Sequence, residues 1–196
     1  MKETKVLLFT DMHGDHRAID IAEKILEKDD FDMIVYLGDL SENIGDADAN
    51  ESDLAKMVHR LGKFGELRVI FGNCDSKELQ DIVEEKELSL HNKLMFEGKT
   101  AIVGWGGSHP TPFDTPGEFD EEEIEKSLSA LLDDAAAKGA ERLILLTHEP
   151  PFDTKADLLP GGPHVGSEAL RKVIKKYQPN INICGHIHEA KATDFI

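Results

Sequence analysis

The residue types that bind metal ions occur in five short motifs, each directly after a short apolar segment. The motifs supply seven side chains with oxygen or nitrogen donors, namely Asp11, His13, Asp39, Asn73, His148, His186 and His188. Carboxylate, amide and imidazole donors without thiolates suit Mn²⁺, Fe²⁺, Zn²⁺ or Ni²⁺. Seven donors exceed the needs of one ion, whereas two ions about 3.5–4 Å apart are typical of in-line displacement at phosphorus. The pattern therefore predicts a two-metal site for phosphoryl chemistry.

The spacing within the motifs supports this interpretation. Asp11 and His13 are two residues apart, as are His186 and His188, so on an extended segment both members of a pair face one way. Glycines beside the motifs allow close backbone approach. A single Asp or His at a strand end is more often a cap or a satisfied polar group than a ligand. Five such motifs in succession favour a metal site over five independent caps.

The apolar segments themselves predict an alternation of strands and helices. Strands buried on both faces are expected over residues 6–9, 33–37, 67–71, 143–146 and 181–184. Apolar residues at helical spacing predict helices over residues 18–26, 54–61, 77–85, 124–135 and 170–177. A hairpin is expected over residues 94–103, and loops over 41–52, 104–118 and 148–166. This is the pattern of an α/β protein, in which ligands bind at the carboxyl ends of the strands.

Length and charge limit the class of protein. The chain has 196 residues, 39 of them acidic and 22 basic, with a formal net charge of −17. The length predicts one domain over residues 1–196. The charge disfavours nucleic acids and membranes as partners, and no apolar run approaches the ~20 residues of a membrane helix. Because no signal-peptide core is present and Cys74 and Cys184 lack zinc or disulfide spacing, we expect a cytoplasmic protein with reduced thiols.

From Asp11 to His188 these motifs resemble the calcineurin-like metallophosphoesterase superfamily. The resemblance implies a four-layer αββα sandwich of the α/β class with two divalent metal ions at the strand ends. It implies that Asp39 bridges the ions, and that a metal-bound hydroxide attacks phosphorus. The implied ligands are Asp11, His13 and His188 for the first ion and Asn73, His148 and His186 for the second. Manganese is the expected metal, with iron, zinc, nickel and cobalt as alternatives.

The expected activity is hydrolysis of a small phosphodiester or phosphomonoester, with Asp39 and Asn73 among the catalytic residues. The alternative is a catalytically weak scaffold or binding protein, because the superfamily includes a retromer subunit that serves as one. The complete ligand set favours the enzyme. A nuclease is disfavoured by the negative charge and by the absence of a stretch rich in Lys and Arg.

The sequence departs from the family pattern at two places. Many members carry His after the Gly-Asn pair, where it helps to protonate the leaving oxygen, but here Cys74 follows. A thiol is a poorer acid and a weak hydrogen-bond donor, so we expect a bias toward leaving groups that need little protonation; packing is the equal alternative for Cys74. Only residues 189–196 follow the last motif. We therefore expect a second sheet without its last strands, and an open edge that favours a homodimer or reduced stability.

Two loop histidines have alternative interpretations. His164 lies in a Gly-containing segment that resembles one in small prokaryotic members, and we expect it to contact substrate as a catalytic residue. Backbone N–H groups at the start of the next helix are candidates to hold a phosphate oxygen, and the alternative is a loop that ends in a cap at Ser167. His109 is expected to be a solvent-exposed loop residue, with replacement of the missing acid as its alternative.

The remaining charged candidates are expected to be structural or superficial. Arg17, beside His16 at the start of the first helix, is expected on the surface, with a phosphate contact as the alternative. His59 and His91 are expected to be structural. The acidic run over residues 120–123 is a helix start, where carboxylates complement the helix dipole.

Overall fold

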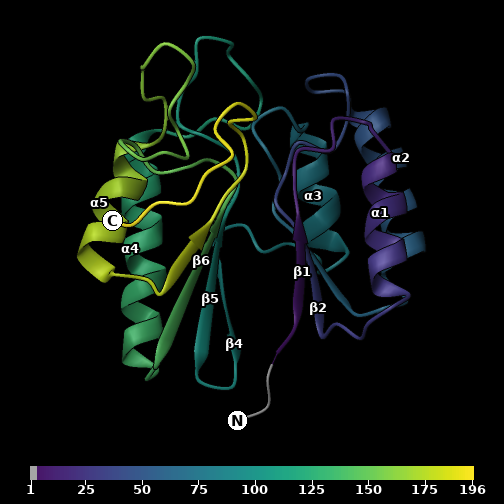
Figure 1. Ribbon diagram of the computed structural model, residues 1–196, viewed down its shortest axis with the longest axis horizontal. Coiled ribbons are helices and arrows are strands. Elements are labelled where there is room, and N and C mark those ends of the chain that lie inside the picture. The colour runs from purple at the N-terminus through teal and green to yellow at the C-terminus, as the bar shows by residue number, and fades with distance from the viewer. Residues whose placement is uncertain (1–3) are drawn as a thin grey trace.

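A computed structural model describes residues 4–196 and contains two β-sheets that face each other (Figure 1). The first sheet has the order β1 (Val6–Phe9), β2 (Met33–Tyr36) and β3 (Glu66–Val69), all parallel. The second has the order β4 (Lys93–Glu97), β5 (Thr100–Trp105), β6 (Arg142–Thr147) and β7 (Ile181–Ile183). In the second sheet β5, β6 and β7 are parallel, and β4, joined to β5 by the predicted hairpin, is antiparallel to β5.

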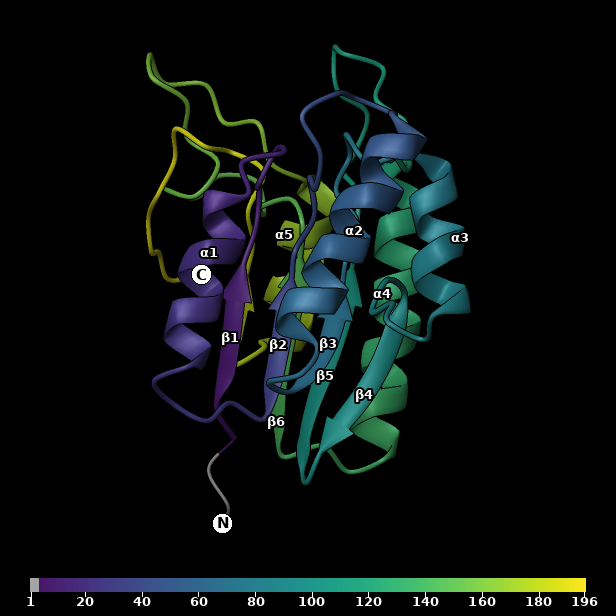
Figure 2. The ribbon, with the colours of Figure 1, turned by 90° about the vertical axis from the view of Figure 1, so that its right-hand side faces the viewer.

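Helices cover the outer face of each sheet (Figure 2). The helices α1 (Arg17–Leu26), α2 (Ala47–Leu61) and α3 (Lys77–Glu85) pack on the first sheet through one apolar core. The helices α4 (Glu121–Ala137) and α5 (Glu168–Tyr177) pack on the second sheet through another. A third core, which includes Val35, Ile70, Ile102 and Leu146, joins the inner faces of the two sheets. These layers confirm the predicted four-layer αββα sandwich.

Most element boundaries agree with the sequence pattern, and one prediction is wrong. Residues 41–52 were expected to form a loop, but α2 already begins at Ala47. The Asp46 side chain accepts a hydrogen bond from the Ala49 backbone N–H and caps the helix. The first turns of α2 are mostly polar and expose much of their surface, so apolar periodicity could not reveal them.

The start of α5 is fully occupied by side chains of the protein. Ser167 Oγ accepts a hydrogen bond from the Leu170 N–H and caps the helix. The Glu121 carboxylate at the start of α4 accepts the N–H groups of Glu168 and Ala169. The prediction that this helix start holds a phosphate oxygen is therefore wrong, and the cap at Ser167 is confirmed.

The parallel strands of both sheets run in the same direction, so their carboxyl ends gather at one end of the molecule, at the top of Figure 1. The long loops that follow β5 and β6 lie at the same end. Within residues 4–196, no helix has the length and apolar character needed to cross a bilayer. The edge strands are β1 and β3 in one sheet and β4 and β7 in the other, and the homodimer expected from open edges stays a prediction.

Candidate metal centre

A first group of ligand atoms comes from the exits of β1 and β7. Atoms of Asp11, His13 and His188 lie within 4.8 Å of one another. The Nε2 atoms of the two histidines are 3.2 Å apart, and His188 Nε2 is 3.2 Å from Asp11 Oδ1. These side chains are partly accessible, whereas the second group is more deeply buried.

The second group comes from the exits of β2, β3, β6 and β7. Atoms of Asp39, His148 and His186 lie within 4.8 Å of one another. Asn73 Oδ1 is 3.1 Å from His148 Nε2, which brings the amide oxygen into the same group. All seven predicted donors thus lie in two adjoining groups.

One oxygen atom belongs to both groups. Asp39 Oδ2 is 3.5 Å from His13 Nε2 in the first group and 3.4 Å from His148 Nε2 in the second. The other oxygen, Oδ1, accepts a hydrogen bond from the Cys74 backbone N–H at 2.9 Å. This bond orients the carboxylate so that Oδ2 faces both sets of histidines.

Four of the donors have left-handed backbone conformations, which are strained for every residue type except glycine. The φ angles are 53° for Asp11, 42° for His13, 57° for Asp39 and 68° for His186. Each such residue costs of order 1–3 kcal/mol, and residues of this kind cluster at functional sites. At each of these positions the backbone turns sharply after a strand, and the side chain is directed toward the other donors.

Glycines make room for the two aspartates. A Cβ atom at Gly72 would lie 2.0 Å from Asp39 Oδ1, and one at Gly185 would lie 2.2 Å from Asp11 Oδ2. Because both carboxylates occupy the space of a missing side chain, substitution at either glycine would displace a candidate ligand.

A second set of buried side chains fixes the backbone under the ligands. The Tyr36 hydroxyl donates to the Asp39 carbonyl oxygen at 2.8 Å and accepts the Met12 N–H at 3.0 Å. Asp75 lies behind Asp39 and accepts the N–H groups of Asp39, Leu40 and Gly72. This role of Tyr36 was not predicted from the sequence, where its only signal was a hydroxyl in an otherwise apolar strand.

The tautomer of His148 suits a metal ligand. Its Nδ1 donates to the Leu37 carbonyl oxygen at 2.7 Å, so the unprotonated nitrogen of a neutral ring is Nε2, which faces Asp39 and Asn73. Burial by itself lowers the pKa of His148, but the Asp39 and Asp11 carboxylates outweigh it and raise the pKa to about 10. The raised value shows that the site carries negative charge that favours a cation.

The donor set fits divalent metal ions. In the first group two imidazole Nε2 atoms converge to 3.2 Å, a distance at which two unprotonated lone pairs repel unless a proton or a cation lies between them. The donors are oxygen and nitrogen atoms throughout, and both cysteines are free thiols. Such a set is suited to Mn²⁺, Fe²⁺, Zn²⁺ or Ni²⁺.

Cys74 lies next to the centre as a protonated thiol. Burial, together with the negative charge of Asp39, raises its pKa to about 12. Its Sγ is 3.6 Å from Asn73 Nδ2, which makes the sulfur a weak acceptor. A thiol with this pKa is a poor proton donor at neutral pH.

The two loop histidines are each held by a buried carboxylate. His164 Nδ1 is 2.8 Å from Asp157 Oδ1, and its partner is therefore not one of the seven donors. His109 Nδ1 is 2.7 Å from Glu149 Oε2. The prediction that His109 is a solvent-exposed residue is wrong, because only 24% of its side chain is accessible. Glu149 was not predicted from the sequence, where its signal was an acidic residue directly after the predicted ligand His148.

The other candidates have no contact with the centre. Arg17 is exposed on the surface and pairs with Asp15. His16 pairs with Asp53 at 2.8 Å. His91 packs among aromatic rings and accepts the Gly106 N–H, which agrees with a structural role.

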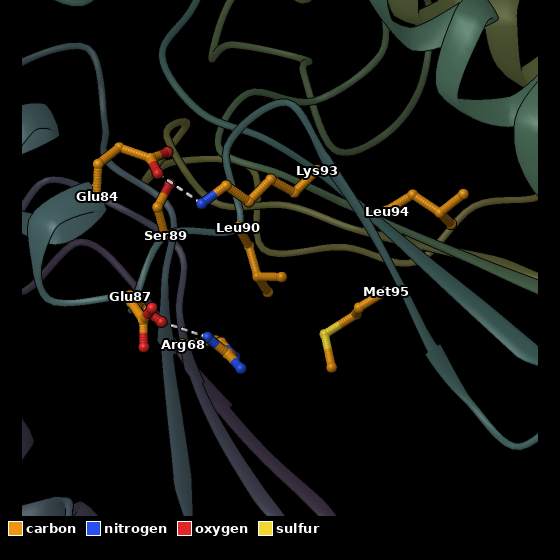
Figure 3. Close-up of a pocket in the computed structure, with 8 residues that line it drawn as sticks. All are labelled: Arg68, Glu84, Glu87, Ser89, Leu90, Lys93, Leu94 and Met95. Atoms are coloured by element: carbon orange, nitrogen blue, oxygen red, sulfur yellow. Dashed lines mark hydrogen bonds and ion pairs between the residues drawn. The ribbon is translucent and has the colours of Figure 1, made fainter.

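Two cavities differ in their relation to the centre. A cavity of about 350 Å³ is lined by Asp11, His186 and His188 of the centre, together with Cys184 and Lys191. A cavity of about 540 Å³ lies between β3 and β4 and contains none of the seven donors (Figure 3). Both of its basic side chains are already paired, since Lys93 bonds to Glu84 and Arg68 to the Glu87 carbonyl oxygen. The chemistry therefore belongs to the smaller cavity.

Comparisons with known proteins identify the family and the fold. The chain is 33% identical over 201 aligned residues to the uncharacterized protein MJ1162 of Methanocaldococcus jannaschii, covering all of this chain and 85% of that protein. The fold is similar to the crystal structure of TT1561 of Thermus thermophilus, with a TM-score of 0.65, 20% identity, and coverage of 91% of this chain and 80% of that one.

The fold is also similar to the purple acid phosphatase PPD1 of yellow lupin (Lupinus luteus) seeds. This match has a TM-score of 0.58 and 18% identity, and it covers 94% of this chain and 38% of the lupin chain. The family model of the calcineurin-like phosphoesterases matches residues 4–190, nearly the whole chain. The chain belongs to the calcineurin-like phosphoesterase family.

Proposed function

We propose that this protein hydrolyses a small phosphodiester or phosphomonoester with two divalent metal ions. The observation that carries the proposal is the position of Asp39 Oδ2, within 3.5 Å of His13 Nε2 and 3.4 Å of His148 Nε2. One carboxylate oxygen shared by two ligand groups is the arrangement that a bridged metal pair requires.

The seven side chains form two sets of ligands that share Asp39. Asp11, His13 and His188 would hold one ion, and Asn73, His148 and His186 the other, with Asp39 between them. When bound, such ions activate water and neutralise the charge that develops on a phosphoryl group. Manganese is our first choice, because the two carboxylates and the amide oxygen are donor types that suit it, while the four imidazoles keep iron, zinc and nickel as alternatives.

The net charge of −17 supports a small substrate. A long polyanion would meet repulsion along the whole surface, whereas a single phosphate ester needs only the local positive charge of the metal ions. The cavity of about 350 Å³ beside Asp11 and His188 is of a size suited to a small molecule.

A metal screen tests the proposal. The metal-free protein is loaded in turn with Mn²⁺, Fe²⁺, Zn²⁺, Ni²⁺ and Co²⁺ and assayed with mono- and bis-p-nitrophenyl phosphate. We expect turnover with at least one ion, and a loss of at least 100-fold in Asp39→Asn, because removal of the shared charge weakens both metal groups. Wild-type protein that binds metal yet turns over neither ester would favour the scaffold alternative.

A further inference from the structure

A pair formed by His109 and Glu149 lies next to the candidate centre but has no part in holding the metal ions. His109 is on the loop after β5, and Glu149 directly follows His148 at the exit of β6. The Glu149 Oε2 atom accepts both the His109 backbone N–H, at 3.1 Å, and a hydrogen bond from ring Nδ1, at 2.7 Å. Glu149 thus fixes the position and the tautomer of the ring together.

The loop that carries His109 is attached to the segment that carries Asn73. Gly107 N–H donates to the Phe71 carbonyl oxygen, and Gly117 N–H donates to that of Asn73. Thr115 Oγ1 accepts a hydrogen bond from Asn73 Nδ2 at 3.0 Å. Both ends of the loop are therefore attached to the segment after β3 that carries Asn73, while Glu149, the partner of His109, directly follows the candidate ligand His148.

The carboxylates around His109 favour its protonated ring. The hydrogen bond that the ring donates to Glu149 raises the pKa of His109, while burial of the ring opposes this effect. The charges of Glu149, Glu121 and Glu118 add smaller increases.

The burial of Glu149 is costly for a purely structural contact. Its side chain is 1% accessible, and within the described chain its second oxygen, Oε1, is buried without a hydrogen-bond partner. A buried carboxylate oxygen without a hydrogen-bond partner destabilises the folded state. Backbone hydrogen bonds already anchor the loop at both ends, so this cost is explained by the protonated ring that Glu149 holds rather than by the loop.

The site needs such a group. Protonation of the leaving oxygen speeds hydrolysis of esters with poor leaving groups, and a thiol such as that of Cys74 is a weaker hydrogen-bond donor than an imidazole. We propose that His109, held by Glu149, donates a proton from Nε2 to the leaving oxygen of the phosphate ester. This inference rests on the proposed function and adds the proton donor to it.

Protons and bonds balance in this step. Water attacks phosphorus and loses its proton to solvent, and the bond from phosphorus to the leaving oxygen breaks. The leaving oxygen takes the proton from His109 Nε2 and departs as an alcohol. The ring is left neutral and regains a proton from solvent before the next turnover.

The test compares leaving groups in His109→Asn. Asparagine retains a donor near the position of Nδ1 for Glu149 but has no group equivalent to Nε2. The probes are p-nitrophenyl phosphate and phenyl phosphate, or their methyl diesters, with the metal that supports wild-type turnover. We expect kcat to fall about 100-fold with the phenyl ester and less than about threefold with the p-nitrophenyl ester. The alkaline limb of the phenyl-ester pH profile should also disappear.

Equal losses with both esters, or no loss with either, would overturn the inference while leaving the proposed function intact. A wild-type protein without turnover of any of these esters would instead contradict both. Because each rate ratio is taken within one variant, a general loss of folded protein cancels. His59→Asn, on the exposed face of α2, is the matched control and should leave the ratio unchanged.

A measurement on the metal-free protein is independent of activity. Nitrogen-15 NMR of the histidine rings should give His109 a titration midpoint above the ordinary ~6.5, with the proton on Nδ1 retained in the neutral form. A midpoint at or below the ordinary value would count against a donor that is protonated at neutral pH.

Discussion

At the scale of single residues, the candidate centre depends on side chains behind the ligands as much as on the ligands themselves. Asp39 receives hydrogen bonds on its side chain from the Cys74 N–H and on its carbonyl oxygen from Tyr36. The Asp75 carboxylate accepts a hydrogen bond from the backbone N–H of Asp39. Together these contacts hold Asp39 in a backbone conformation, with a φ of 57°, that is unfavourable by itself.

Tyr36→Phe tests this support. The change leaves the Met12 N–H and one lone pair of the Asp39 carbonyl oxygen without their buried partner, so we expect a loss of about 1–3 kcal/mol in the free energy of unfolding. We also expect metal affinity to fall about tenfold or more, because the backbone beside two ligands is released. Urea denaturation and metal titration by calorimetry measure the two effects.

Tyr177→Phe is the matched control for this variant. Its hydroxyl bonds near the surface to Asp133 and the Ser129 carbonyl oxygen, neither of which belongs to a candidate ligand. Metal affinity should be unchanged in the control. An equal fall in both variants would mean that Tyr36 has no specific part in the centre.

At the scale of elements, the loop after β6 is organised around one buried carboxylate. Asp157 accepts the N–H groups of Thr154 and Gly166 and a hydrogen bond from His164 Nδ1. Burial tends to raise the pKa of Asp157, but these bonds outweigh it and lower the pKa. The same contact with Asp157 raises the pKa of His164.

The contribution of His164 to stability should therefore depend on pH. A histidine whose pKa is higher in the folded state stabilises fully below its unfolded pKa of ~6.5 and loses that contribution as pH rises through the folded value. We expect the difference in unfolding free energy between wild type and His164→Asn to be larger at pH 5.5 than at pH 9. Urea denaturation of both proteins at the two values measures it.

His59→Asn is the control here too, since His59 lies exposed on α2. Its difference from wild type should stay constant between the two pH values. A His164 difference that does not change with pH would show that the ion pair with Asp157 does not anchor the loop in solution.

At the scale of the whole molecule, two sheets supply the halves of one site. β1, β2 and β3 contribute donors from the first sheet, and β6 and β7 from the second. Metal ions bound across this junction would stabilise the packing of the sheets, because ions that bind the folded state alone shift the unfolding equilibrium.

Metal binding should therefore raise the melting temperature. At a free Mn²⁺ concentration of about 100 Kd the stabilisation is about 2.7 kcal/mol, which corresponds to about 5–10 °C for a domain of this size. Thermal unfolding with Mn²⁺, and with sodium chloride at equal ionic strength, separates specific binding from screening of the −17 charge. The same rise in Asp39→Asn would assign the effect to surface charge instead.

The sequence by itself determined the order of the strands and helices and the seven donors. These features are local: buried strands are continuous apolar runs, and each donor follows one of them directly. The start of α2 was not predicted, because its cap at Asp46 and its polar first turns have no apolar periodicity. A cap such as Ser167 was visible in the sequence, whereas the occupation of the α5 start by Glu121 was not, because it joins residues 46 or more apart.

Only the tertiary structure decided how the donors divide and what surrounds them. That Asp39 Oδ2 faces both groups depends on the packing of two sheets, and the supporting contact from Tyr36 depends on its position within one of them. The pairing of His109 with Glu149 joins residues 40 apart, one after β5 and the other after β6. Such contacts are set by the register and approach of separate elements, and no pattern along the chain encodes them locally.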